Sequence, residues 1–250
     1  MEKQKVDKLT DLLRRLNTGE STLAVREEAK EFLATVNPAD LSLAEQQLIE
    51  AGLAPEDLRH LCAAHMEMMG GQLEQMKAQL APGHVIHTLV CEHEQILCFL
   101  DELDSLNQAI QRTAAGPLAQ EQRDHLLHIA GDLVGAEPHH QREEDILFPE
   151  LERRGVSGPP QIMRMEHEEL RRRKRELLEL AQAGASADFN AFKRKLDVAS
   201  KFIVLTLRDH IFKENNILYP TALQVVRDDA IWAQMKEGCD RIGYCCFTPA

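Results

Sequence analysis

Hydrophobic residues recur at helical spacing through most of the chain, and the breaks between these runs predict where helices end. Leucines repeat at three- and four-residue intervals in "VDKLTDLLRRL", and "SLAEQQLIEAG" pairs Ser42 with Glu45 as a capping box and stops at Gly52. These signals predict short helices within residues 1–80. "LAPGH" at 80–84 then interrupts the pattern with Pro and Gly, which predicts a domain boundary.

Four longer helical runs follow this boundary. They are separated by short segments rich in Gly, Ala and Pro near 114–119, 153–160 and 183–188. Short loops between long helices favour antiparallel neighbours, so the sequence predicts an all-α protein with an up-down-up-down four-helix bundle. The expected domains are a small helical domain at 1–80, the bundle at 81–227, and a C-terminal tail at 228–250 that carries Cys239, Cys245 and Cys246.

The second and fourth helical runs end in related motifs. "HHQREEDILFP" and "HIFKENNILYP" align without a gap on Ile-Leu-aromatic-Pro, which places His139 opposite His210 and Glu143 opposite Glu214. Upstream, "CEHEQIL" in the first run resembles "MEHEELR" in the third. We infer that the bundle consists of two copies of a helix pair.

The spacing within these motifs brings histidines and glutamates to one helix face. Each residue of an α-helix advances by about 100°, so position i+4 returns to within about 40° of position i. Side chains from four helices then meet in the bundle interior, where imidazoles complete each of two iron ions and carboxylates bridge them. The predicted ligands are His93, His139, Glu143, His167, His210 and Glu214. Six nitrogen and oxygen donors favour iron over tetrahedral zinc. Apolar neighbours are expected to wall the site: Leu97, Leu147, Met163, Ile217 and Leu218.

A shifted pair competes with one of these motifs. His140 and Glu144 also have four-residue spacing, but they are turned by about 100° from the preferred pair, and a solvent-facing or supporting role is expected for them. Glu137-x-x-His140 has the spacing of a ferritin-like carboxylate site. No second Glu-x-x-His occurs, which argues against that alternative.

Two further features are expected to lie outside the site. His87 is about 120° around its helix from the predicted ligand His93, so it is at most an alternative or supporting ligand. The basic run "RRRKR" at 171–175 is expected to be a solvated helix face. Arg171 and Lys174 nevertheless lie on the side of His167, and contact with a bridging carboxylate or an anion is a hypothesis.

Composition narrows the classes of function. Hydrophobic residues make up 44% and aromatic residues only 4%, a mixture that favours a helical globular protein. The net charge of −12 repels nucleic acid and anionic lipid, so neither is expected as a partner. Neither a long apolar run nor a signal peptide is evident, which predicts a cytoplasmic protein. The six cysteines lack CxxC pairs and are expected to be reduced thiols, with Cys62 and the vicinal Cys245 and Cys246 as redox-active alternatives.

At these motifs the chain resembles the hemerythrin-like family, the HHE cation-binding domain, whose hallmark is His-x-x-x-Glu followed by Leu-Phe-Pro. The resemblance covers about 84–225. Residues 1–80 resemble the DUF438-like helical domain of unknown function often found ahead of such bundles, and "RIGYCCFTP" resembles the tail of the same architecture. The family implies a non-heme di-iron centre. Oxygen-carrying members place a further histidine four residues after the third-helix ligand, where this chain has Arg171, so dedicated oxygen transport is disfavoured.

The sequence therefore predicts a di-iron protein that binds a small diatomic ligand, oxygen or nitric oxide, for sensing, storage or a stress response. The N-terminal domain or the tail is expected to contact a protein partner. In an enzymatic alternative, the same centre reduces nitric oxide or peroxide, or donates iron for the repair of damaged iron-sulfur centres. A metal-stabilised scaffold is a third hypothesis, and a binding or sensing protein is favoured over a dedicated enzyme.

Overall fold

The computed structural model describes residues 8, 10–11, 72–113, 118–184 and 188–249. Helices dominate these residues, and no strand occurs among them. The predicted helical domain at 1–80 lies almost wholly outside the described residues. The first complete helix among the described residues is α5 (Gln72–Gln79). None of the described helices is both long and apolar enough to span a membrane.

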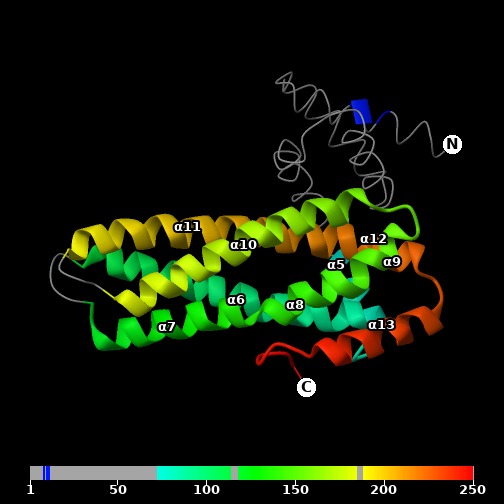
Figure 1. Ribbon diagram of the computed structural model, residues 1–250, viewed down its shortest axis with the longest axis horizontal. Coiled ribbons are helices and arrows are strands. Elements are labelled where there is room, and N and C mark those ends of the chain that lie inside the picture. Colours follow the sequence, from blue (N-terminus) through cyan, green and yellow to red (C-terminus); the bar gives the residue numbers. More distant parts are fainter. Residues whose placement is uncertain (1–7, 9, 12–71, 114–117, 185–187, 250) are drawn as a thin grey trace.

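Four antiparallel helical columns form the bundle (Figure 1). The first column is α6 (Val85–Arg112) and the third is α10 (Gly158–Ala183). The other two columns are composite. The second contains α7 (Gln120–Gly135), α8 (Glu137–Arg142), η2 (Glu143–Leu147) and α9 (Phe148–Glu152), and the fourth contains α11 (Phe189–Lys213), η3 (Glu214–Leu218) and α12 (Tyr219–Val225). Because α6 and α10 each pack against both α7 and α11, the predicted all-α bundle with up-down-up-down topology is confirmed.

Both composite columns change helical type at the same point of the sequence repeat. Glu143 begins η2 and Glu214 begins η3, and both segments are π-helical. The backbone N–H groups of Phe148 and Tyr219 donate to the carbonyls of these glutamates, five residues back. Short π-helical turns are uncommon and often occur at functional sites. Their matched position supports the inference that the bundle contains two copies of one helix pair.

The apolar core is divided into two clusters. One includes Ile86 and Phe148 and lies at the end of the bundle that α13 covers, and the other includes Leu100 and Leu207. In every column a layer of buried histidine and glutamate lies between the residues of the two clusters. The predicted wall residues Leu147, Met163, Ile217 and Leu218 are buried, whereas Leu97 is only partly buried.

A further helix, α13 (Asp229–Ile242), folds back against α6, α8 and η2 (Figure 1). The side chain of Asp228 caps its N-terminus, and Trp232 packs into the first core cluster. Gly238 allows close packing, because a Cβ at this position would lie 2.6 Å from Cδ1 of Ile146. The sequence predicted only a tail here, so this helix was missed.

Candidate metal centre

The structure places all six predicted ligands in the polar layer. Each side chain belongs to a residue that is at most 1% exposed. The set is contributed by all four columns: His93 by α6, His139 by α8, Glu143 by η2, His167 by α10, His210 by α11 and Glu214 by η3. Helical spacing within each column and packing between columns therefore bring the six side chains together.

Glu214 faces histidines on two sides. Its Oε2 lies 3.1 Å from Nε2 of His93. Its Oε1 lies 2.9 Å from Nε2 of His210 and 3.5 Å from Nε2 of His167. A carboxylate with its two oxygens directed at different imidazole groups has the arrangement of a bridge between two metal ions.

Glu143 occupies the facing position. Its Oε2 lies 3.6 Å from Nε2 of His139 and 3.5 Å from Nε2 of His167. Its Oε1 accepts a hydrogen bond of 2.7 Å from the hydroxyl of Tyr219. The aligned residue in the first copy of the repeat is Phe148, which has no hydroxyl. The two copies therefore differ at this aligned position, because Tyr219 brings a hydroxyl to the centre and Phe148 brings only an apolar ring.

The outer nitrogens of two histidines are held by glutamates from the neighbouring column. Nδ1 of His139 donates to Glu92 at 2.7 Å, and Nδ1 of His210 donates to Glu166 at 2.8 Å. Each of these buried glutamates directly precedes a predicted ligand in its own helix. They occupy equivalent positions in the two copies of the repeat.

Residues that follow the two central glutamates hold the other two histidines. Nδ1 of His167 donates to Glu144 at 2.7 Å, and Nδ1 of His93 donates to Oδ1 of Asn215 at 2.8 Å. With each Nδ1 held by an acceptor in this way, the Nε2 atoms are directed at the centre, as in metal-binding histidines, and Nε2 of His167 lies 3.0 Å from Nε2 of His210. A supporting role for Glu144 was one of the expected alternatives, whereas sequence reasoning missed the roles of Glu92, Glu166 and Asn215, although Glu92 and Glu166 occupy the repeated Glu-His pairs.

Electrostatics at the centre favour a cation. Burial and the charge of Glu214 raise the pKa of Glu143 well above its usual range. Oε2 of Glu143 and both carboxylate oxygens of Glu214 are buried and face histidine Nε2 atoms at 2.9 to 3.6 Å. Burying two carboxylates together is costly unless cations balance their charge. Because histidine nitrogens converge on the same oxygens, metal ions fit the layer better than further protein groups do.

The supporting carboxylates remain charged. Burial alone would raise the pKa of Glu92, but hydrogen bonding from His139 and the charge of Arg142 outweigh it and hold the pKa at about 2. Hydrogen bonds from His167 and Arg171 similarly outweigh burial and hold the pKa of Glu144 at about 2. Negative partners increase the ability of a histidine to bind a metal.

The sequence profile of the hemerythrin HHE cation binding domain matches residues 84–222, more than half of the chain. The chain belongs to this hemerythrin family. The profile of a family of unknown function, DUF438, matches residues 9–75. A comparison with curated proteins finds no match. Together, the hemerythrin match and the histidine and glutamate clusters indicate a metal-binding protein.

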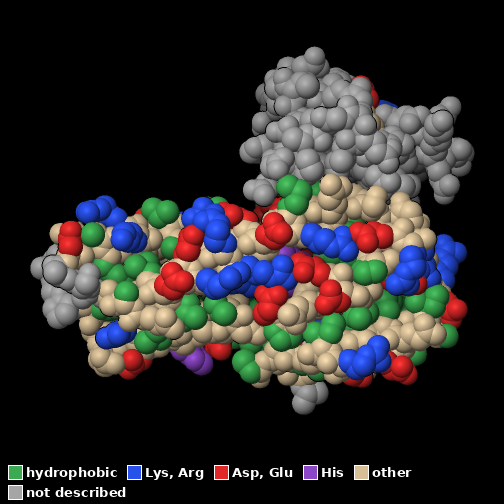
Figure 2. Space-filling view, viewed as in Figure 1, with side chains coloured by type: hydrophobic (Ala, Val, Ile, Leu, Met, Phe, Trp, Pro, Cys, Tyr) green, Lys and Arg blue, Asp and Glu red, His purple; other side chains and the backbone are tan. Residues whose placement is uncertain are grey.

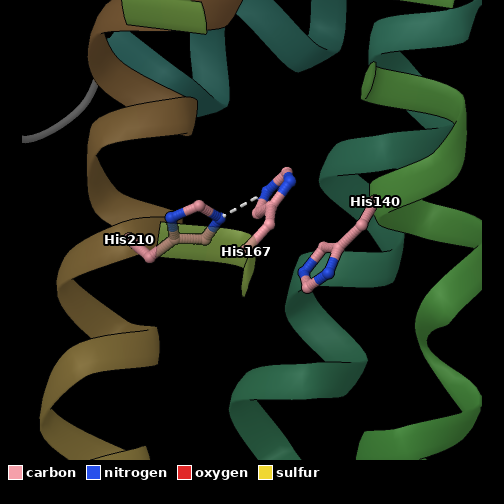
Figure 3. Close-up of side chains that lie close together, drawn as sticks. All are labelled: His140, His167 and His210. Carbon is pink, nitrogen blue, oxygen red and sulfur yellow. Dashed lines mark hydrogen bonds between the residues drawn. The ribbon is translucent and has the colours of Figure 1, made fainter. Parts of the chain in front are cut away.

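His140 adds a fifth imidazole to this hemerythrin-family centre. It is only 3% exposed, which excludes the solvent-facing role expected as one of its alternatives. Its ring stacks on that of His167, with centroids 3.9 Å apart and planes 9° from parallel (Figure 3). His140, His167 and His210 offer nitrogens within 4.8 Å of one another. Nδ1 of His140 is buried without a hydrogen-bond partner among the described residues. The aligned residue of the second copy is Ile211, so the two halves differ here.

The basic run on α10 is only partly solvated. Arg172 and Arg175 are exposed as predicted, but Lys174 is buried and the prediction is wrong there. Arg171 forms ion pairs with Glu137 at 2.8 Å and with Glu144 at 2.9 Å. In this hemerythrin-family protein, the arginine at the position of the carriers' extra histidine therefore stabilises a carboxylate that supports His167.

The other histidine near the start of α6 has different surroundings. Nδ1 of His87 lies 3.7 Å from Sγ of Cys91, and the groups of buried donors that converge at the centre do not include it. Cys91 is one of five described cysteines, all of which are free thiols. Cys62 lies outside the described residues.

The C-terminal tail reaches the hemerythrin-family centre through Glu92. Nη2 of Arg142 donates to Oε1 of this carboxylate at 2.6 Å, and the hydroxyl of Thr248 donates to the same oxygen. The guanidinium of Arg142 also lies 4.7 Å from the ring centroid of Tyr244 and 3.9 Å from Sγ of Cys245. The tail thus packs around the ion pair that supports His139.

Proposed function

We propose that the polar layer holds two iron ions and that Glu143 and Glu214 bridge them. His93 and His139 would complete one iron, and His167 and His210 would complete the other. Bound iron supplies the redox and ligand-binding chemistry. The chain's own groups position the imidazoles, direct their Nε2 atoms at the centre and exclude bulk water.

The convergence of buried imidazole nitrogens and carboxylate oxygens carries this proposal. Three groups of donor atoms cluster in the layer, and Glu214 belongs to two of them, one with His93 and His139 and one with Glu143 and His167. A shared carboxylate suits a pair of ions better than a single ion. The nitrogen and oxygen donors exceed the four of a structural zinc site, which favours iron.

His140 is proposed as a further ligand on the side of His167 and His210. Its buried, unpaired Nδ1 supports this role. Five imidazoles would then be divided unequally between the two irons. The fifth would come from α8, since Arg171 occupies the α10 position used in oxygen carriers.

We propose a small diatomic ligand, oxygen or nitric oxide, for sensing, storage or a stress response. The centre is enclosed between two apolar clusters, and the aromatic rings of Phe148 and Tyr219 stack near His167 and His93 at 5.9 and 5.5 Å. Such walls admit only small ligands. The hydroxyl of Tyr219 lies 3.5 Å from Nε2 of both His93 and His139, within reach of a ligand held there.

A second candidate function is an enzyme or iron donor that acts on nitric oxide or peroxide or in the repair of damaged iron-sulfur centres. Arg171 favours it over oxygen transport, because this residue departs from the pattern of the oxygen carriers. The tail and the N-terminal region are proposed as the contacts for a protein partner.

Metal analysis with optical spectroscopy tests the proposal. Full-length protein loaded anaerobically with ferrous iron should contain two irons per chain, and its spectrum should change when oxygen or nitric oxide is added. A stable nitric oxide adduct indicates a binding protein, whereas release of nitrous oxide indicates a reductase. One iron or less per chain, or equally tight zinc binding with no spectral response, would contradict the proposal.

A further inference from the structure

Lys174 is a buried cation, and the carboxylate whose charge acts on it, that of Glu137, is already paired with Arg171. Lys174 is only 2% exposed, and no hydrogen bond or ion pair joins its ammonium to another residue in the described part of the chain. Burial lowers its pKa to about 8, so the group still carries its charge at neutral pH. A buried charge without a partner destabilises a fold. A residue of this kind points to a ligand of opposite charge.

A pocket of about 240 Å³ opens beside this side chain. It lies between the second column and α10 and is lined by Val134, Glu137, Arg171, Lys174 and Arg175. Lysine and arginine side chains, interspersed with acidic ones, lie along the visible face of the bundle (Figure 2). The volume corresponds to several water molecules, which suits a small ion.

Only some of the positive charges around the pocket are paired with carboxylates. Arg171 already pairs with Glu137 and Glu144, so both nearby carboxylates are engaged. Arg175 donates only to a backbone carbonyl, that of Arg171, and among the described residues it has no carboxylate partner. Lys174 and Arg175 therefore remain as two cations directed at one small cavity, in a protein with a net charge of −12.

We infer that this pocket binds a small inorganic oxyanion, with the Lys174 ammonium as its buried partner and the Arg175 guanidinium at its rim. Charge-assisted hydrogen bonds from two cations suit oxygens of a phosphate-like or nitrate-like ion. The site lies beside the iron layer, because its cations come from α10 beyond His167 and form no hydrogen bond or ion pair with the six predicted ligands, although the charge of Lys174 acts on His140.

Calorimetric titration of the metal-loaded, full-length protein tests the inference, with inorganic phosphate and nitrate as probes at ionic strength held constant with chloride. At least one probe should bind saturably. Lys174→Met should weaken binding at least tenfold, and Arg175→Gln, an exposed change that leaves the fold intact, should weaken it severalfold. Lys195→Met removes the same charge from an exposed position of α11 and should bind as the parent protein does.

Thermal unfolding gives a second readout. Lys174→Met should raise the melting temperature in chloride alone, because it removes the buried charge, and should abolish the increase that the bound anion causes in the parent protein. Binding of equal affinity in the parent and in Lys174→Met would overturn the inference. So would the lack of saturable binding, or an optical shift showing that the anion binds only at the metal.

Discussion

At the scale of single residues, the glutamates on either side of a helix histidine have opposite surroundings. Glu92 and Glu166 precede His93 and His167 and are buried, whereas Glu94 and Glu168 follow the same histidines and are exposed. Only the preceding glutamates hold a histidine of the adjacent column. The chain thus contains matched pairs of identical residues that differ in their link to the centre.

Replacing Glu166 by Gln should lower metal affinity by about 10- to 100-fold. The change removes the negative charge that holds Nδ1 of His210 and pairs with Lys213. Glu168→Gln, two residues away, should leave the affinity within about twofold. Competition with a chelator, followed by iron per chain, measures both variants. Equal losses in the two would show that the buried glutamate does not support the site.

Helical spacing and the internal repeat predicted which histidines and glutamates meet, because both patterns are local in sequence. The supporting hydrogen bonds were missed because they join different columns, and packing between helices determines them. His140 was misjudged for a related reason. The turn of about 100° from His139 was expected to favour a solvent-facing or supporting position, but packing between columns places the ring of His140 against that of His167 inside the bundle.

At the scale of secondary structure, the sequence predicted the four columns but not their internal changes. The π-helical segments η2 and η3 and the docked helix α13 were not expected. Hydrophobic periodicity is too coarse to distinguish a π turn from an α turn. The tail prediction relied on the resemblance of "RIGYCCFTP" to a known tail, whereas α13 forms because its apolar face buries Trp232, Met235 and Cys239 against the bundle.

Replacing glycine by alanine should affect stability differently at Gly131 and at Gly238, because only Gly238 lies in the contact between α13 and η2. Gly131→Ala should raise the free energy of unfolding by about 0.5 to 1 kcal/mol, because alanine favours helix and nothing lies within 4 Å of the new Cβ. Gly238→Ala should cancel or reverse this gain, because Ile146 must move to admit the methyl group. Urea unfolding of both variants makes the comparison. A full gain at Gly238 would show that α13 packs less tightly than described.

At the scale of the whole molecule, the bundle and the tail share one buried ion pair. Glu92 lies in the first column, Arg142 in the second and Thr248 near the C-terminus, and all three groups meet beside His139. The hemerythrin match ends at residue 222, so Thr248 and Tyr244 belong to the centre's surroundings without belonging to the matched domain. The proposed domain boundary at 227–228 therefore does not separate the tail from the site.

Thr248→Val should weaken retention of the metal. Loss of one hydrogen bond to Glu92 costs about 1 kcal/mol, which corresponds to roughly fivefold faster metal release under a chelator. Thr206→Val on α11, the same change outside this network, should release metal at the rate of the parent protein. Stopped-flow measurement with a chromogenic chelator compares the three proteins. Identical release rates in the three proteins would show that the tail does not affect metal retention.

The contact between Thr248 and Glu92 also implies an order of events during synthesis of the chain, because the ligands are translated before the tail that supports them. When the last residue of α12, Val225, has been translated, every predicted ligand exists, but the tail that completes the surroundings of Glu92 does not. A nascent chain that captures metal at this stage holds Glu92 with His139 and Arg142 but without Thr248. Firm retention is acquired only when residues 244–248 arrive, so a protease that removes them would leave a folded bundle that loses its metal more readily.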